Sequence, residues 1–334
     1  MAVTLKEVAA KAGVSRSAVS RTFTAGASVS AKTRRKVEEA ARELGYTPSL
    51  IARSLATNRT KLIGLVANNF QNPIFLEVFD LYTQALQERG LRPLIVNLTN
   101  ETDPDASVQM LRQYRVGGVV VATSTLPEDF ASAFAGANVP VVHAFGRHGE
   151  TSNIPVVGID NRACGALAAE TLLQRRYRSI AVLGGPQSAT STIDRIAGFK
   201  DAMSAAGQPV ADIRFATNYS YYAGREAMHS LLSEKSVDAV FCGDDLICMG
   251  AMDAARSRGL NIPRDIGFLG FNDMDMARWE AYALTTIRQP TRDIIQASID
   301  LIAAMVSEPD GEHPSRLFDC TVVERKTLKP VTNS

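Results

Sequence analysis

The stretch that decides the fold reads VTLKEVAAKAGVSRSAVSRTF, residues 3–23. Thr4 and Glu7 have the spacing of a capping box, in which each side chain bonds the other residue's backbone N–H group, so we expect a helix to begin at Leu5. Gly13 ends this helix, and Ser15 caps a second one three residues later. The short Gly-containing turn between them favours an angled helix pair over one long helix.

A third helix is expected to follow the pair. Ser30 caps it, its span is Ala31 to Leu44, and Gly45 stops it. The helices share an apolar side at helical spacing, formed by Leu5, Val8, Ala9, Ala12, Ala18, Val19, Phe23, Val37, Ala40, Ala41 and Leu44. Two short helices and a bracing third make an all-α helix-turn-helix module.

The charge of the chain is concentrated in this module. Residues 1–60 hold eleven Lys/Arg and four Asp/Glu, a formal charge of +7, whereas the other 274 residues carry −6 and bring the total to +1. A compact basic module on a mildly acidic body points to a polyanionic partner for the module alone. Charge by itself leaves a solvated basic surface as the alternative.

The residues that a helix-turn-helix would present to DNA lie at the start of the second helix. There the exposed side chains are Ser15, Arg16, Ser17, Ser20 and Arg21. Such a helix lies in the major groove, where an arginine can bond guanine O6 and N7 with two parallel donors. Two exposed arginines on an isolated helix would be read as solvated. Within a capped helix-turn-helix of charge +7 they favour base contacts, with phosphate contacts from Thr4, Ser30, Thr33 and the basic run 32–36.

From Lys61 the pattern changes to short apolar runs that alternate with amphipathic segments. The expected strands are residues 62–67, 93–98, 118–122, 139–143, 156–158, 180–184, 214–216, 239–242 and 266–270. The expected helices between them include residues 75–89, 107–114, 165–175, 193–206, 223–233 and 250–258. This alternation predicts an α/β core of two lobes, each built on a doubly wound parallel sheet.

Ligands of such sheets bind beyond the carboxyl ends of the strands, so the residues that follow each strand are candidate ligand contacts. These residues combine amides and carboxylates, an arginine and several aromatic rings, the set that suits a sugar with its hydroxyl groups and apolar ring face. They are residues 68–70, Ser124, 145–147, 160–161, 190–195, Tyr219, 244–245 and 271–273.

The head module resembles the start of lactose-repressor-type (LacI/GalR) bacterial regulators. The matching runs are residues 3–9, 12–15, 19–21, 29–30, 33–37, 44–48 and 52–55, and the departures are Ala18, Thr24 and Ser49, where the family commonly has Thr, Asn and Asn. The resemblance implies a DNA-binding domain at residues 1–47 and a hinge helix with its linker at 48–60. In this reading Ala52 and Leu55 belong to a hinge helix that folds on DNA, and Leu55 wedges into the minor groove; a plain apolar linker is the alternative.

The body is similar to the periplasmic-binding-protein-like core of the same family. The matching segments are Ser191 to Phe199, Asp244-Asp245 before Gly250-Ala251-Met252, Gly270 to Asp273, and Leu284 to Pro290. The resemblance implies a two-lobed effector-binding and dimerisation core at 61–330, with lobe 1 near 61–160 plus 290–320 and lobe 2 near 161–288. It implies effector contacts from Arg195, Asp244 and Asn272, and from the less fixed positions Phe70, Phe75, Ser124, Arg147 and Tyr219.

Several of these assignments have competing structural interpretations. Arg195 could form a salt bridge to Asp160, Asp194 or Asp244 instead of binding a ligand. Asp245 and Asp273 are expected to cap helices or tie loops, and Trp279 could lie at the cleft rim or in local packing. If Arg147 and His148 both enter the cleft, the effector could be a sugar acid or a sugar phosphate.

Other classes of protein are not supported by the sequence. It has no GxxxxGK[ST], no GxGxxG after a strand and no HExxH, so we expect neither an enzyme nor a bound cofactor or metal. The alternative is a sugar-binding receptor or an enzyme of carbohydrate metabolism without a DNA role; a receptor would need a signal peptide and no basic head. Scattered cysteines and the lack of a long apolar run favour the cytoplasm and no membrane contact.

We therefore expect a homodimeric, sequence-specific transcription regulator that acts as a repressor. Its partners would be palindromic double-stranded operator DNA and a small-molecule, carbohydrate-like effector. No leucine heptads follow the body, so an appended tetramerising coiled coil is not expected.

Overall fold

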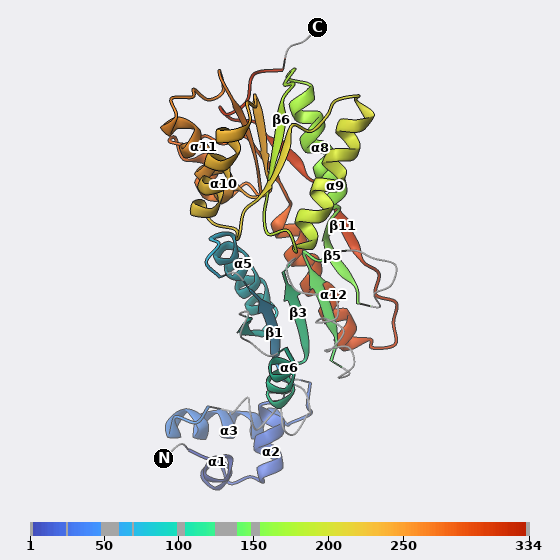
Figure 1. Cartoon of the computed structure of the whole chain (residues 1–334). Helices are drawn as coiled ribbons and strands as arrows, with labels where there is room; N and C mark the ends of the chain where they lie inside the picture. The colour runs from blue at the N-terminus through green and yellow to red at the C-terminus, as the bar shows by residue number, and fades with distance from the viewer. Residues whose placement is uncertain are drawn as a thin grey trace. The chain divides into compact units, whose positions relative to one another are not determined.

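The computed structural model describes residues 3–24, 26–47, 60–68, 70–98, 104–123, 139–147 and 154–331. The chain divides into two units, Met1–Thr60 and Lys61–Ser334 (Figure 1). Each unit has its own hydrophobic core and is considered by itself.

The first unit consists of the helices α1 (Leu5–Ala12), α2 (Arg16–Thr22) and α3 (Ala31–Leu44). Thr4 and Glu7 form the complete capping box, and the Ser15 and Ser30 side chains cap the two later helices. The unit's small core includes Val8, Val19 and Val37, all fully buried. The helix ends agree with the sequence prediction because each is set by local capping chemistry.

The first lobe of the second unit is built on a six-stranded parallel sheet. Its strand order is β11-β5-β4-β3-β1-β2. One face, which includes Leu65 and Val120, is packed against α5 and α12, and the other, which includes Val66 and Val121, is packed against α6. The elements are β1 (Leu62–Ala67), α5 (Ile74–Glu88), β2 (Arg92–Asn97), α6 (Pro104–Gln113), β3 (Gly118–Ala122), β4 (Val141–Ala144), β5 (Val156–Ile159), α12 (Thr291–Ser307) and β11 (Arg316–Phe318).

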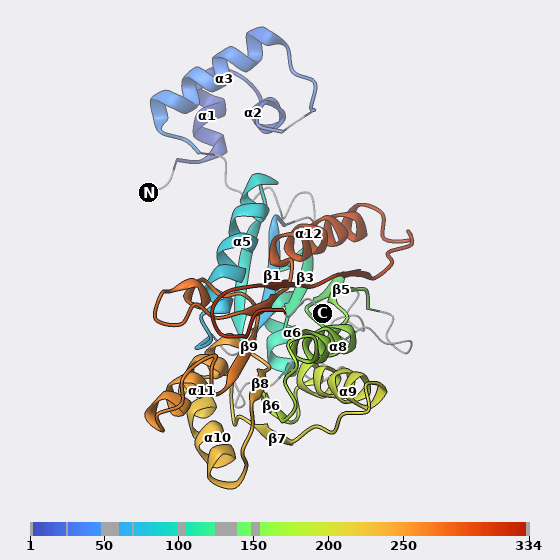
Figure 2. The same cartoon turned by 90° about the horizontal axis from the view of Figure 1, so that it is seen from above.

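The second lobe repeats this plan with the strand order β12-β10-β9-β8-β6-β7, in which only the β10–β12 pair is antiparallel. Helices α8 and α9 cover one face, and α10 and α11 cover the other (Figure 2). The elements are α8 (Asn161–Leu173), β6 (Ile180–Gly184), α9 (Thr190–Ala205), β7 (Asp212–Phe215), α10 (Tyr221–Glu234), β8 (Ala239–Cys242), α11 (Asp245–Ser257), β9 (Gly267–Phe271), the 3₁₀ helix η1 (Asp275–Arg278), β10 (Thr286–Arg288) and β12 (Thr321–Val323).

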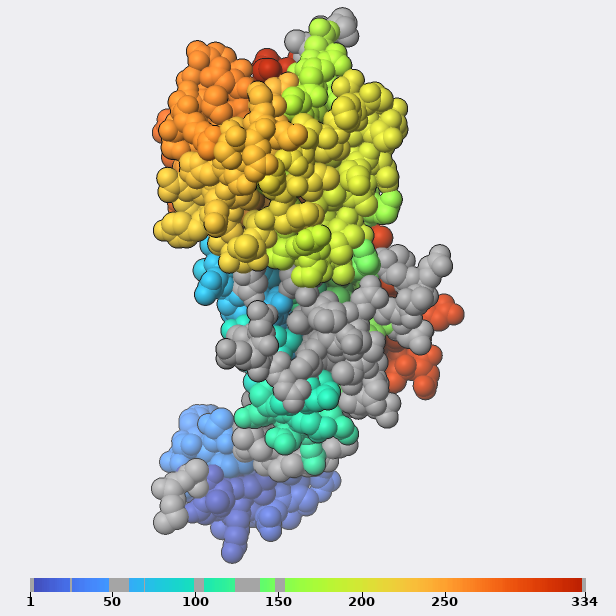
Figure 3. All heavy atoms as spheres, viewed as in Figure 1, coloured from blue at the N-terminus to red at the C-terminus, as the bar shows by residue number. Residues whose placement is uncertain are grey.

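The chain passes from one lobe to the other after β5, after β10 and after β11. The space-filling view shows the second lobe, in yellow-green to orange, against the first (Figure 3). The fold class is the predicted one, a helix-turn-helix module followed by an α/β core of two sheet-based lobes. Among the helices of the described residues, none combines the length and apolarity that a membrane crossing requires.

Two differences from the predicted elements concern the site. α8 begins at Asn161 and α11 at Asp245, four and five residues before the predicted starts, because Asp160 and Asp244 accept bonds from the first free backbone N–H groups and cap these helices. The sequence pattern also did not single out α12 or the three-residue strands β10, β11 and β12. Strands this short carry little periodicity, and they form only where a neighbouring strand is already in place.

Candidate functional site

The first candidate surface is α2 with its caps. Ser15, Arg16, Ser17, Ser20 and Arg21 are all exposed, as the sequence predicts for a groove-reading helix. The Ser15 and Ser17 hydroxyls lie 2.9 Å apart, and Arg21 Nε donates to the Ser17 carbonyl oxygen at 3.4 Å. The Arg16 and Arg21 guanidinium groups thus project from a short helix without an anionic partner among the described residues.

Residues of α1 and α3, which flank α2 in the sequence, form hydrogen bonds with one another or with α2. Thr4 donates to Glu7 from both its backbone N–H and its hydroxyl, and these bonds lower the pKa of the Glu7 carboxyl. Ser30 donates its hydroxyl to Thr33 at 2.9 Å, and both belong to the N-terminal turn of α3. Arg34, which the sequence grouped with the phosphate contacts, instead donates to the Thr22 carbonyl oxygen at 2.9 Å and ties α3 to α2.

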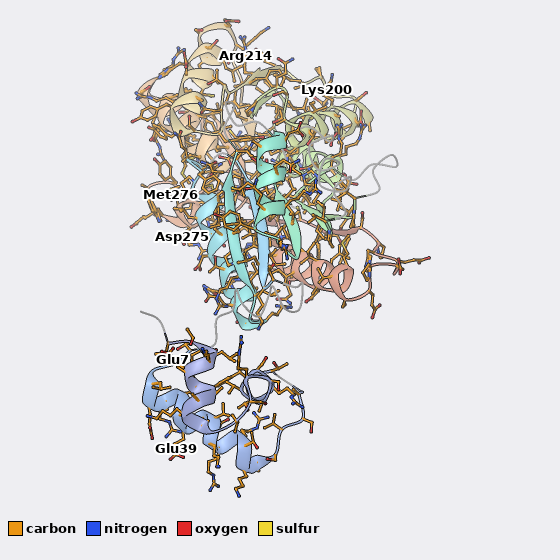
Figure 4. The ribbon with its side chains drawn as sticks, turned by 90° about the horizontal axis from the view of Figure 1, so that it is seen from below. Glu7, Glu39, Lys200, Arg214, Asp275 and Met276 are labelled. Carbon is orange, nitrogen blue, oxygen red and sulfur yellow. The ribbon has the colours of Figure 1, made fainter. Side chains whose placement is uncertain are left out.

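The first unit has four acidic residues, and none of them belongs to α2. Two of the four, Glu7 on α1 and Glu39 on α3, are labelled in Figure 4. Exposed cations remain on α3 at Lys32, Arg35 and Lys36. The predicted hinge contacts Ala52 and Leu55 lie outside the described residues.

The second candidate site is a cavity of about 700 Å³, including the open space at its mouth, at the carboxyl ends of strands of both sheets. This is where ligands of open α/β sheets bind. The wall has an apolar part and a part rich in amides and hydroxyls. The described lining residues are Asn68, Asn72, Ile74, Phe75, Val78, Ala122, Thr123, Phe145, Ile159, Asn161, Ser191, Arg195, Tyr219, Gly243, Asp244, Asn272 and Gln289.

Arg195 is the cation of this wall. Its Nε donates to Asn161 Oδ1 at 2.8 Å, its Nη1 donates to the Gly243 carbonyl oxygen at 2.8 Å, and its guanidinium carbon lies 3.6 Å from the centroid of the Phe271 ring. None of the carboxylates in the described parts of the chain forms a salt bridge with Arg195. Its hydrogen-bond partners are neutral, and its positive charge acts to lower the pKa of the neighbouring Asp244 carboxyl.

The position of Arg195 depends on how closely α8 and α9 approach. A Cβ atom at Gly165 would lie 2.0 Å from the Arg195 carbonyl oxygen, and one at Gly198 would lie 1.9 Å from that of Arg162. Only glycine fits at these two crossing points, and their spacing brings Asn161 of α8 within reach of the Arg195 guanidinium.

Asp244 is the anion of the wall and is 2% exposed. Its Oδ1 accepts from the backbone N–H groups of Leu246 and Ile247, at 2.8 and 3.4 Å, which caps α11. Its Oδ2 accepts from Asn72 Nδ2 at 3.0 Å and from Asn272 Nδ2 at 2.9 Å. Burial raises the pKa of this carboxyl, and the bonds from Asn72 and the two backbone groups act against that rise.

Aromatic and hydroxyl groups complete the cavity. The Tyr219 hydroxyl lies 3.3 Å from the Ser191 hydroxyl and 3.2 Å from that of Thr192, and Phe75 lines the first-lobe side. The structure therefore brings together five of the eight predicted effector contacts: Phe75, Arg195, Tyr219, Asp244 and Asn272.

Of the other three predicted contacts, two are placed differently and one lies outside the described residues. Phe70 is not among the described lining residues; its ring stacks on Phe79, with 4.8 Å between the centroids. Arg147 makes a two-pronged ion pair with Asp194, with Nε to Oδ2 at 2.8 Å, and is not a described lining residue either. Ser124, like His148, lies outside the described residues.

The structure also shows what Asp245, Asp273 and Trp279 contact, for which the sequence left more than one interpretation. Asp245 is fully buried and accepts from Thr286 Oγ1 at 2.6 Å and from the Met274 N–H at 2.8 Å, so it ties loops together. Asp273 forms ion pairs with Arg288 and Arg325. Trp279 is 51% exposed and is absent from the described cavity wall.

The sequence did not identify Asn72, Thr123 and Gln289 as lining residues. Thr123 directly follows β3, whose end was predicted correctly, but Ser124 was read there instead; Gln289 directly follows β10, a strand that the sequence pattern did not single out. Asn72 lies several residues after β1, and only its bond to Asp244, 172 residues away, marks it.

Comparison with known proteins adds relatives of both units. A family described as "Bacterial regulatory proteins, lacI family" matches residues 4–49, and one described as "Periplasmic binding protein-like domain" matches residues 169–328. The HTH-type transcriptional repressor PurR of Serratia proteamaculans (strain 568) is 37% identical over 333 residues, which cover 97% of this chain and 96% of that protein. PurR of Proteus mirabilis (strain HI4320) is 35% identical over 331 residues, with the same coverage.

Two solved structures of transcription regulators are similar to nearly the whole chain. The lac repressor dimer bound to operator and the anti-inducer ONPF is 27% identical, with a TM-score of 0.90 over 98% of this chain and 100% of that one. The complex of the transcriptional regulator CelR with cellobiose is also 27% identical, with a TM-score of 0.73 over 97% of this chain and 99% of that one.

Proposed function

The chain belongs to the lacI family of bacterial regulatory proteins, and from this premise we propose that it represses transcription under the control of a small molecule bound in its interlobe cavity. Its relatives are DNA-binding transcriptional repressors and not enzymes. The proposal therefore replaces the alternative of a receptor or carbohydrate enzyme without a DNA role. Its cellular place would be the cytoplasm, where operators are found.

On DNA, the proposed reading residues are those exposed around α2: Ser15, Arg16, Ser17, Ser20 and Arg21, with phosphate contacts from Thr4, Ser30 and Thr33. Two heads of a homodimer would bind the half-sites of a palindrome. The family resemblance adds Ala52 and Leu55 as hinge contacts at the operator centre. The similar lac repressor structure, which is a dimer bound to operator, supports a dimer.

We propose a neutral sugar or sugar derivative as the effector. The observation that carries this is the cavity lining, which combines the Arg195 guanidinium, the Asp244 carboxyl group and several side-chain amides with the rings of Phe75 and Phe145. Such a wall bonds hydroxyl groups and covers an apolar ring face. The cellobiose complex of the CelR regulator supports the same class. The pairing of Arg147 with Asp194 favours a neutral ligand over a sugar acid, because that arginine's charge is already compensated.

A thermal-shift screen of the full chain tests the effector class. Neutral sugars, sugar acids, sugar phosphates and nucleosides are compared, and a ligand at 100 times its Kd adds about 2.7 kcal/mol to the unfolding free energy. We expect the neutral sugars to raise the Tm. Arg195→Ala should weaken binding of the hit by roughly 10- to 100-fold, because it removes a charged donor from the cavity.

Arg162→Ala is the matched control for this variant. Arg162 is exposed on α8 and pairs with Asp201 outside the cavity, so its loss should leave ligand binding unchanged. A hit that binds Arg195→Ala as tightly as the parent chain would place the effector elsewhere, and a screen in which only acidic ligands bind would refute the neutral class.

A further inference from the structure

The Asp244 carboxylate in the cavity is already fully bonded by the chain. A carboxylate offers about four acceptor positions. Oδ1 receives the N–H groups of Leu246 and Ile247, and Oδ2 receives the side-chain amides of Asn72 and Asn272. A ligand hydroxyl therefore gains a bond from Asp244 only in place of one of these four donors.

Three of the four donors are fixed within the second lobe. The two backbone groups belong to the first turn of α11 and cannot leave without unwinding it. Asn272 is held from its other end, because its Oδ1 accepts from Gln289 Nε2 at 2.8 Å.

Asn72 is different because it comes from the first lobe. It is 2% exposed, and its Nδ2–Oδ2 bond to Asp244 joins the β1–α5 connection to the start of α11. Its Oδ1 accepts from the Ile74 N–H at 3.1 Å, which satisfies the first turn of α5 next to the lining residue Phe75. Gln289, Asn272, Asp244 and Asn72 thus form one chain of hydrogen bonds from the β10–α12 crossing to the N-terminus of α5.

We propose that Asn72 is an internal competitor of the effector: a donor group of the ligand takes the Asp244 Oδ2 position that Asn72 occupies, and so releases the bond between the lobes at α5. The inference rests on the proposed effector site and specifies how that site is regulated. It also defines the ligand chemistry, because only a hydroxyl or N–H group can replace the Asn72 amide. A ligand that presents only acceptors there leaves the Asn72 bond intact.

The test measures the affinity of the full chain for neutral sugars by isothermal titration, with glucose, galactose, ribose and cellobiose as the probes. Two variants are compared with the parent. Asn72→Ala removes both the bond to Asp244 and the acceptor of the Ile74 N–H, whereas Asn72→Ser keeps a side-chain oxygen for the Ile74 N–H but is too short to keep the bond to Asp244. We expect both variants to bind the sugar more tightly, by roughly tenfold, because the competing donor is gone.

The direction of the change separates competition from a structural role. If Asn72 only shapes the cavity, its truncation should lower the sugar affinity. If it acts only by accepting from the Ile74 N–H, the sugar affinity of Asn72→Ser should equal that of the parent chain. Either result would overturn the proposal. Asn68→Ala is the control: Asn68 also lines the first-lobe wall but accepts from Thr123 rather than bonding Asp244, so it should not increase affinity.

Failure of the inference is distinguishable from failure of the proposed function. Suppose that the parent chain binds a sugar, that Arg195→Ala does not, and that Asn72→Ser binds the sugar no more tightly than the parent. In that case only the competition by Asn72 is refuted. If the parent binds none of the sugars, the effector site as proposed fails and the competition falls with it. A deoxy sugar that lacks one hydroxyl should identify the displacing group, because its affinity should become independent of the residue at position 72.

Discussion

Asp245 shows how one buried carboxyl can make stability depend on pH. It is fully buried, and this desolvation raises its pKa well above the ordinary value. A raised pKa in the folded state means that the carboxyl contributes most to stability when protonated. This contribution is complete below the unfolded pKa of about 3.9 and is lost as pH rises toward the folded pKa.

Asp245→Asn should remove this dependence. The amide has the same shape, accepts from the Met274 N–H and donates to Thr286 Oγ1. As pH rises above the unfolded pKa of about 3.9, the unfolding free energy of the variant should therefore increase relative to that of the parent, by up to about 1.4 kcal/mol per pH unit until the folded pKa is passed. Urea unfolding at several pH values measures the difference. A constant difference over this range would show that Asp245 does not titrate there.

Arg16 and Lys36 should act differently on DNA. Arg16 is exposed at the start of α2, and its replacement by Ala should cost roughly 1–3 kcal/mol on the preferred operator but little on random DNA if it bonds a guanine edge. Lys36 is an exposed cation of α3, so Lys36→Ala should weaken both kinds of binding and reduce the salt slope by about one unit. Fluorescence anisotropy at several salt concentrations measures both. Equal losses on operator and random DNA for Arg16→Ala would reassign it to phosphate.

Among the elements, the α8–α9 pair determines where the cavity cation lies. Gly165→Ala places a methyl group against the Arg195 carbonyl oxygen, where the ideal distance would be only 2.0 Å. The helices must separate, which we expect to cost about 1–3 kcal/mol of stability and to weaken effector binding by moving Arg195 away from Asn161. Ala163→Ser on the exposed side of α8 is the control. An unchanged Tm and sugar affinity for Gly165→Ala would show that this close approach is not needed.

The elements also show what the sequence could predict. The starts of the three helices of the first unit were predicted to the residue because Thr4, Ser15 and Ser30 cap them within four residues of sequence; the ends of α1 and α3 were predicted too, from Gly13 and Gly45. The buried strands β1, β3, β6 and β8 were predicted equally well from their apolar runs. Arg195 and Asp244 were predicted as cavity residues because they follow strands in a recognisable family pattern.

Long-range pairings account for what was missed. Nothing local connects Asn72 to Asp244, or Arg147 to Asp194, because these contacts arise only when two lobes or two loops meet. Cys164 and Cys320 are another case: in the sequence they are scattered thiols, yet their sulfur atoms lie 3.0 Å apart. Residue spacing predicts which face a side chain occupies, but not which distant side chain it meets there.

For the whole molecule, regulation requires that the cavity and the DNA-binding unit influence each other. The second unit has a cavity between lobes that the chain joins at three crossings, after β5, β10 and β11. A ligand that favours one arrangement of the lobes changes operator affinity by the same factor by which operator changes ligand affinity. The sign of this change depends on which arrangement binds operator, and both induction and corepression satisfy the same relation.

Control of operator binding from the interlobe cavity is tested most directly by the operator affinity of the full chain with and without its sugar. The operator is first selected from random duplexes, and its Kd is then measured by anisotropy at zero and at saturating sugar, in the parent chain and in Arg195→Ala. We predict a change of roughly 5- to 150-fold in the parent and none in the variant. An operator Kd that stays the same at saturating sugar in the parent chain would contradict a regulator controlled from its interlobe cavity.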